Sequence, residues 1–132
     1  SIGVPQPLLI FGTEEQKKKY LPRVARKEIS AFALTETDAG SDPANMSLRA
    51  EATEDSSAFI LNGEKLWCTN GTFAELLVVM AVHPATKKIS AFIVEAATPG
   101  VQVVGRCRFM GLKAIGNAVL RLTNVRVPIL IR

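Results

Sequence analysis

The sequence after residue 28 is divided into short runs of strand-forming residues separated by turn signals. The runs are SAFALT, SLRAEAT, AFILNG, EKLWCTNG, ELLVVMAVH, KISAFIVE, VQVVG and AVLRLTNVRV. Short strands at regular spacing, with no helical segment between them, are typical of an antiparallel barrel or sandwich. The predicted fold class is therefore mainly β: an antiparallel β-barrel domain preceded by a short broken helix.

Two Asn-Gly dipeptides predict where the strands turn. A type I′ turn needs positive φ at both central positions, and Asn62-Gly63 tolerates this. We therefore expect residues 58–61 and 64–69 to pair as a hairpin around this dipeptide. Asn70-Gly71 predicts a longer loop at the far end of the second of these strands.

The segment before residue 28 carries a helix signal. Thr13 and Gln16 match a capping box, in which the threonine hydroxyl accepts from the amide of Gln16 and the glutamine side chain accepts from the amide of Thr13. A helix is expected to begin at Thr13 and to end near residue 21, because Pro22 has no N–H for the previous turn. A second short helix is expected to start at Pro22 and to run through residue 25.

The distribution of charge argues against a nucleic-acid-binding protein. The net charge is +4, with 16 basic and 12 acidic residues, and six of the basic residues fall between Lys17 and Lys27 among acidic ones. This mixture is typical of a solvated helix face, because a basic stripe interleaved with aromatic residues is missing. A phosphate-bearing cofactor or substrate is compatible with the charge.

Targeting and cysteine patterns point to a reducing compartment. The sequence has no apolar run long enough to span a membrane, and its first residues lack the charged start and apolar stretch of a signal peptide. Cys68 and Cys107 have neither metal-ligand spacing nor the density of a disulfide scaffold. No metal site is therefore predicted.

Two stretches carry most of the chemistry. In AFALTETDAGSD an apolar strand runs into a loop where the amides of Gly40 and Ser41 can form an anion nest, although a plain tight turn has the same composition. In LNGEKLWCTNG, strand alternation places Lys65, Trp67 and Thr69 on one face. The indole offers a flat wall for a planar ring, although a core tryptophan with its N–H satisfied is the commoner explanation for this segment alone.

Four segments resemble, in the same order, the signature segments of acyl-CoA dehydrogenases: GTEEQKKKYLP, AFALTETDAGSD, LNGEKLWCTNG and MGLKAIGNAVLRLTNVRVP. In that family a middle β-barrel domain holds FAD between itself and C-terminal helices. The resemblance implies that residues 1–28 end the helical N-terminal domain. Residues 29–128 would form the β-barrel domain that binds FAD and acyl-CoA, and residues 129–132 would start the C-terminal helical domain.

The resemblance also implies flavin contacts. Phe32, Leu34 and Thr35 resemble residues along the edge of the flavin, with Thr35 donating to its pyrimidine side. Trp67 resembles the indole that covers the flavin face opposite the substrate, and Thr69 resembles the hydroxyl near flavin N5. A donor preorganised beside the ring stabilises the charge that arrives with a hydride.

The remaining implied roles concern phosphate, substrate and the catalytic base. Gly40 and Ser41 resemble the pyrophosphate contacts, with Ser41 also close to the CoA arm. Glu36 belongs to the structural part of the motif in this family. The glutamate that acts as base comes from the C-terminal helical domain, so no catalytic residue is expected in this chain and the isolated chain is expected to be inactive.

The function implied by the resemblance is α,β-dehydrogenation of an acyl-CoA thioester with hydride transfer to FAD. The implied partners are an acyl-CoA substrate, an electron-transfer flavoprotein as acceptor, and further copies of the full-length protein in a dimer or tetramer. The implied location is the bacterial cytoplasm or the mitochondrial matrix. Two alternatives remain: a flavin-dependent oxidase or monooxygenase of the same fold, which oxygen reactivity would reveal, and a noncatalytic β-barrel binding module.

Overall fold

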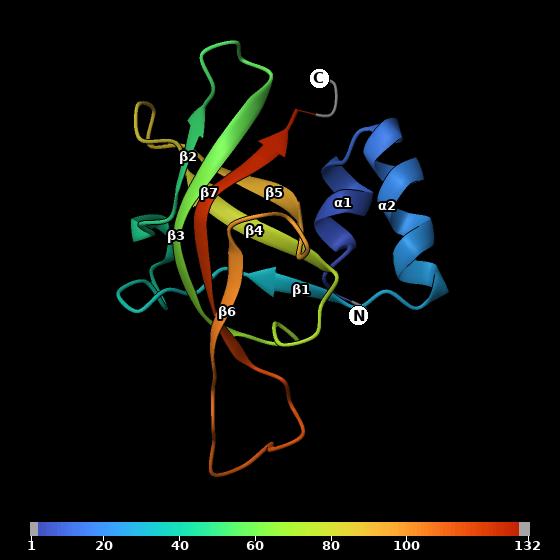
Figure 1. The fold of residues 1–132 in the computed structure, drawn as a ribbon, viewed down its shortest axis with the longest axis vertical. Helices are drawn as coiled ribbons and strands as arrows, with labels where there is room; N and C mark the ends of the chain where they lie inside the picture. Colours follow the sequence, from blue (N-terminus) through green and yellow to red (C-terminus); the bar gives the residue numbers. More distant parts are fainter. Residues whose placement is uncertain (1–2, 130–132) are drawn as a thin grey trace.

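The computed structural model describes residues 3–129, and within them one curled sheet carries two helices on one side (Figure 1). The sheet has seven strands. The helices are α1 (Gln6–Phe11) and α2 (Glu14–Arg26), with a short 3-10 turn, η1 (Pro43–Asn45). The strands are β1 (Ser30–Ala33), β2 (Arg49–Ala52), β3 (Ala58–Cys68), β4 (Leu76–Val82), β5 (Ile89–Glu95), β6 (Val101–Arg106) and β7 (Ala118–Pro128). The predicted mainly-β fold is confirmed.

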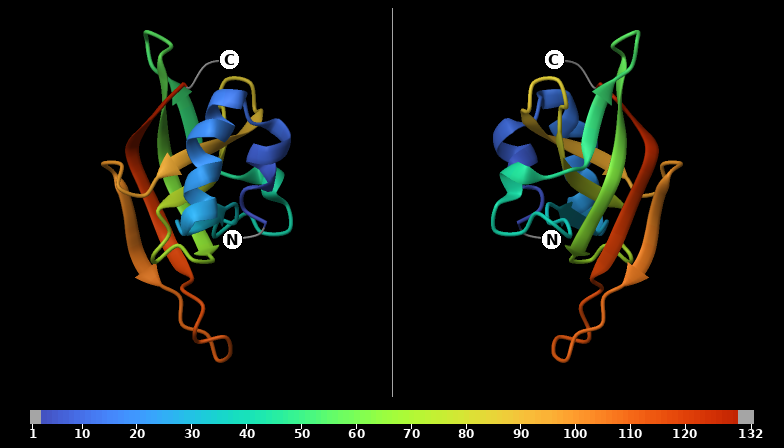
Figure 2. Two further views of the ribbon diagram at one scale, coloured as in Figure 1. Left: turned by 90° about the vertical axis from the view of Figure 1, so that its right-hand side faces the viewer. Right: turned by 90° about the vertical axis from the view of Figure 1, so that its left-hand side faces the viewer.

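The strand order is β1-β4-β2-β3-β7-β6, with β5 on β4. The β2–β3, β3–β7, β4–β5 and β6–β7 pairs are antiparallel, as predicted, whereas β1 and β2 each run parallel to β4. Parallel pairing is possible there because long connections separate β1 and β2 from β4. Figure 2 shows the strands curling into a half-barrel, with the β6–β7 loop at the opposite end from the β2–β3 turn.

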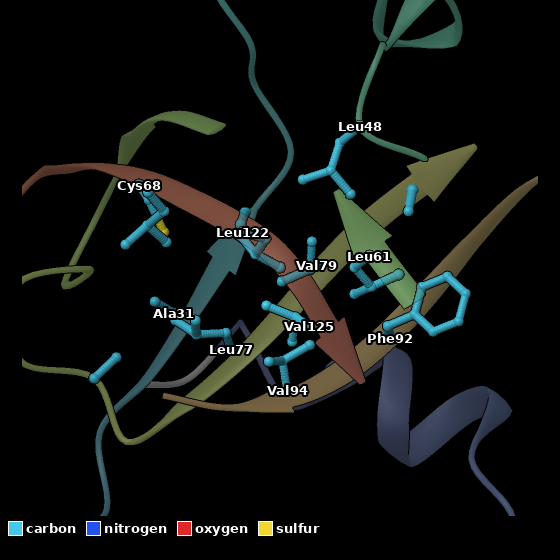
Figure 3. Packing of buried hydrophobic residues seen from close by; sticks show 14 of the residues in the cluster. Ala31, Leu48, Leu61, Cys68, Leu77, Val79, Phe92, Val94, Leu122 and Val125 are labelled. Atoms are coloured by element: carbon cyan, nitrogen blue, oxygen red, sulfur yellow. The ribbon is translucent and has the colours of Figure 1, made fainter. Parts of the chain in front are cut away.

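The concave side of the sheet holds the hydrophobic core (Figure 3). Strands β3, β4 and β7 supply many of its side chains because each presents alternate residues inward. Leu61, Val79 and Val125 show no solvent exposure at all. Each such side chain contributes about 1.5–3 kcal/mol relative to the exposed state.

Both helices pack on the outside of β4 and β5. The predicted capping box is present, with the amide of Gln16 donating to the Thr13 hydroxyl and the amide of Thr13 donating to the Gln16 side chain. The predicted break at Pro22 is wrong, because α2 continues to Arg26. Tyr20 is buried against the sheet and Leu21 and Val24 are partly buried there, and this packing offsets the hydrogen bond that proline removes. Neither helix within residues 3–129 is long and apolar enough to cross a membrane.

The predicted hairpin at Asn62-Gly63 is also wrong, because β3 is one continuous strand through this dipeptide. Residues on both sides stay paired with β7: Leu61 with Val125 and Gly63 with Leu122. Because that spacing leaves one extra residue on β7, a β-bulge lies here, and the Asn62 side chain accepts from the amide of Asn124 at 2.8 Å. The dipeptide therefore bends the sheet and does not end a strand. The loop predicted at Asn70-Gly71 is present.

Candidate functional site

A hollow of about 630 Å³ lies where the N-terminal segment meets the ends of β1 and β3. Its lining consists of Gly3, Val4, Gln6, Pro7, Phe32, Trp67, Thr69 and Asn70. The structure thus brings Phe32, Trp67 and Thr69 together from two strands that are far apart in the sequence. None of the described residues in this lining is a carboxylate or a histidine.

Trp67 faces the hollow because the alternation of β3 is interrupted just before it. Lys65 pairs with Leu120 and Cys68 pairs with Ala118, so Leu66 and Trp67 together oppose a single residue of β7. This β-bulge turns the strand by one step. The predicted shared face of Lys65 with Trp67 and Thr69 is therefore wrong: Lys65 points into the core, while Trp67 and Thr69 lie outside.

The conformation and exposure of Trp67 are both unusual for a tryptophan. Its φ is +54°, a left-handed conformation that costs a residue with a side chain about 1–3 kcal/mol. Its side chain is also 58% exposed, although indole gains more than most side chains from burial. A strained backbone that presents a large flat ring to solvent is typical of a ligand-binding position.

The other predicted contacts follow β1. Thr35 and Leu34 come directly after the strand and are half-buried, and the carbonyl of Thr35 accepts from the amide of Leu66 at 2.7 Å. Neither residue lines the hollow. This hydrogen bond joins the end of β1 to the bulged part of β3.

Gly40 and Ser41 are exposed in the following loop and do not line the hollow either. Gly40 does not have the positive φ of an αR–αL anion nest. A Cβ built at Gly40 would have no atom within 4 Å, so the fold itself does not require glycine there. The space beside the Cα of Gly40 is therefore open to a group approaching from outside.

Beneath this loop lies a buried ion pair between Lys65 and Glu36. The Lys65 Nζ lies 2.8 Å from a Glu36 carboxylate oxygen, and the two side chains are 0% and 7% exposed. Burial lowers the pKa of the Lys65 ammonium, an effect that Glu36 opposes. Burial alone would raise the pKa of the Glu36 carboxyl, but hydrogen bonds from Lys65 and from the amides of Leu48 and Ser47 bring it below its ordinary value. Each partner therefore favours the charged form of the other.

Comparison with known proteins identifies the fold and the motifs. The model of the acyl-CoA dehydrogenase middle domain matches residues 31–125, and the model of the acyl-CoA dehydrogenase N-terminal domain matches residues 1–28. The chain belongs to the acyl-CoA dehydrogenase family.

Individual family members show how much of their length this chain spans. It is 55% identical to "Probable acyl-CoA dehydrogenase FadE10" of Mycobacterium tuberculosis over 97% of the chain, and it spans 20% of that protein. A crystal structure of an acyl-CoA dehydrogenase from Bacillus anthracis, complexed with FAD, superposes with a TM-score of 0.91 at 39% identity, covering 96% of this chain and 22% of that one. The prolyl acyl carrier protein oxidase AnaB superposes with a TM-score of 0.86 at 40% identity, covering 93% and 33%.

Sequence reasoning missed one wall of the hollow and the ion pair beneath the loop. The residues from Gly3 to Pro7 that line the hollow carry no chemical signal in the sequence, so only the fold reveals them. Lys65 and Glu36 are 29 residues apart, and no spacing rule relates them. No group of three or more His, Cys, Asp or Glu side chains within residues 3–129 could hold a metal ion.

The two cysteines should differ sharply in reactivity. Cys68 is buried behind the bulge, and burial raises the pKa of its thiol to about 11, whereas Cys107 is half-buried. Because the thiolate is the reactive form, an alkylating reagent at pH 8 is expected to label Cys107 and to leave Cys68 unmodified in the folded chain. Peptide mapping by mass spectrometry measures this. Both cysteines should react in denaturant, and equal labelling in the folded chain would contradict the burial of Cys68.

Proposed function

We propose that this chain forms the flavin-binding part of an acyl-CoA dehydrogenase that removes two hydrogens across the α,β bond of an acyl-CoA thioester. The observation that carries the proposal is the hollow between Trp67, Thr69 and Phe32, where a strained and exposed indole stands beside a hydroxyl. A planar ring placed there gains an aromatic wall and a donor together. The FAD in the Bacillus anthracis relative supports the choice of flavin.

In this proposal FAD, when bound, accepts the hydride from the substrate. Trp67 covers one face of the ring, Thr69 donates near N5, and Phe32, Leu34 and Thr35 lie along its edge. A fixed donor beside the ring stabilises the negative charge of the reduced state more than a mobile water does, because it needs no reorganisation.

Phosphate and substrate contacts belong to the loop after β1. The exposed backbone at Gly40 and the hydroxyl of Ser41 bind the pyrophosphate, and Ser41 also contacts the CoA arm. The open space around Gly40 supports this assignment, because a phosphate can approach the chain closely there. The base that removes the α-proton comes from outside this chain.

The wider organisation is part of the same proposal. Residues 1–28 end a helical N-terminal domain, residues 29–128 form the cofactor domain, and residues 129–132 begin a C-terminal domain; of these last, 130–132 lie outside the described residues. The full-length protein forms a dimer or tetramer and passes its electrons to an electron-transfer flavoprotein.

A second candidate is an oxidase of the same fold. It is favoured by the similarity to the oxidase AnaB, which is as close in sequence as several dehydrogenases. The rate at which oxygen reoxidises the substrate-reduced full-length protein separates the two. A dehydrogenase resists oxygen, whereas an oxidase turns over with it.

Two substitutions in the full-length protein test the flavin site. Trp67→Ala removes the stacking wall and is expected to weaken FAD binding by about 1–3 kcal/mol, or on the order of tenfold or more in Kd. Thr69→Val keeps the side-chain shape but removes the donor, so we expect it to change the flavin spectrum and reduction potential more than the stability. Titration with FAD, absorbance spectra and potentiometry measure these effects.

The matched control is Phe73→Ala, because Phe73 is 49% exposed but does not line the hollow. It should leave FAD binding unchanged. If Trp67→Ala and Thr69→Val both retained the flavin content, spectrum and substrate reduction of the unmodified protein, the assignment of this hollow to flavin would be wrong.

A further inference from the structure

The Lys65–Glu36 pair holds together three segments: β3, the end of β1 and the loop between Glu36 and Ser47. Lys65 Nζ donates to Glu36 at 2.8 Å and to the carbonyl of Leu34 at 3.0 Å. Lys65 thereby ties β3 to the end of β1. Its third neighbour is the sulfur of Met46, at 3.8 Å, which lies at the far end of the intervening loop.

Glu36 closes that loop on itself. Its carboxylate accepts from the amide of Ser47 at 2.5 Å and from the amide of Leu48 at 2.9 Å. The segment between Glu36 and Ser47 carries Gly40 and Ser41, so a single carboxylate joins its beginning to its end. The ammonium of Lys65 then fixes this closed loop to β3.

The burial of Lys65 is also linked to the orientation of Trp67. Lys65 and Cys68 are both buried although they are three positions apart, whereas a regular strand would place inward residues two positions apart. The bulge between them accommodates this spacing and turns Trp67 outward with its φ of +54°. The inward position of Lys65 thus accompanies the outward orientation of the indole.

Stability alone does not explain a buried ion pair at this place. Replacing such a pair by well-packed apolar side chains is often neutral or stabilising, because desolvation cancels much of the attraction. Apolar side chains, however, cannot make directed hydrogen bonds. The pair makes four directed hydrogen bonds to or within the loop, through one carbonyl, two amides and the link between the charged groups.

We propose that Lys65 and Glu36 are the positioning residues of the flavin site, which set the loop with Gly40 and Ser41 and the end of β1 against the strand that carries Trp67. The proposal rests on the proposed function. Neither side chain reaches the hollow, so both act only through the groups they hold.

The decisive experiment compares single and double variants of the full-length protein saturated with FAD. Lys65→Met alone leaves the Glu36 charge buried without its partner and is expected to destabilise the fold. Adding Glu36→Gln removes that lone charge, and its single amide oxygen can still accept from one of the two backbone amides. We expect the double variant to recover most of the lost thermal stability.

If the pair positions the flavin site, the flavin properties of the double variant should not recover together with its stability. The double variant should keep an altered flavin absorbance spectrum, and its kcat/KM should stay on the order of a hundredfold below that of the unmodified protein. If its spectrum and kcat/KM return together with its stability, the pair has only a structural role and the proposal is overturned. The proposal is equally overturned if Lys65→Met leaves the spectrum and kcat/KM unchanged.

Two control variants on or beside β3 complete the test. Arg121→Met breaks the exposed pair with Glu64 and should change neither stability nor the spectrum. Leu61→Ala destabilises the same strand away from the loop, and its folded fraction should keep the unmodified spectrum. If Leu61→Ala reproduces the spectral change of the Lys65 variants, loss of stability explains it and positioning is refuted.

The outcome also separates this proposal from the proposed function. If Trp67→Ala and Thr69→Val change the flavin while the Lys65 variants do not, the flavin site stands and the positioning role fails. If none of these variants changes the flavin, the site itself is misplaced.

Discussion

Replacing Gly63 by alanine is expected to lower the free energy of unfolding by about 2–6 kcal/mol, which is a large part of the total stability of a small domain. Gly63 has a φ of +144°, where a residue with a Cβ pays about 1–3 kcal/mol in strain. The new Cβ would also lie 2.8 Å from the Cα of Leu48, and such overpacking costs about 1–3 kcal/mol more. Urea unfolding of the chain, followed by circular dichroism, measures the loss.

Gly105 provides the matched control, since it also lies in a strand at a bulge. A Cβ there would have no atom within 4 Å, and its φ is outside the positive range. Gly105→Ala is therefore expected to change the stability by less than about 1 kcal/mol. Equal losses for the two variants would show that β3 does not approach Leu48 as closely as described.

The features that the sequence predicted correctly depend on local interactions. The capping box at Thr13 needs only residues three positions apart, and the strand runs need only their own composition. The hairpin predicted at Asn62-Gly63 is wrong because Asn-Gly is compatible both with a hairpin turn and with a β-bulge. Two contacts favour the bulge. Leu122 and Val125 of β7 pair with β3 on either side of the dipeptide, and Leu48 approaches Gly63 closely. Neither contact is local.

In the candidate site, too, the local features were predicted correctly and the long-range ones were not. That Trp67 and Thr69 share a face was correctly predicted, but a strict period of two also placed Lys65 with them. The bulge moved Lys65 inside, where Glu36 compensates its charge. The inward orientation of Lys65 thus depends on a long-range ion pair and on an extra residue in β3, and neither can be predicted from the periodicity of the strand.

The isolated chain is expected to show no dehydrogenase activity and at best weak affinity for FAD. Removal of the α-proton requires a base within hydrogen-bond reach of the substrate. The described residues that line the hollow include no carboxylate or histidine, and Glu36 is engaged by Lys65 below the loop. The chain also spans only 20% of the length of its relative FadE10.

In the isolated chain, solvent also weakens the proposed contacts to the flavin. Trp67 is 58% exposed, so a ring stacked on it would keep its other face in water. Charges and dipoles act several times more weakly in water than in a closed site, so the donors here hold the ring poorly. The test mixes the 132-residue chain with FAD, acyl-CoA thioesters of several lengths and an artificial acceptor dye, with the full-length protein as positive control. Substrate-dependent bleaching of the dye by the chain alone would show that it carries its own base, and the division of labour proposed for this site would then be wrong.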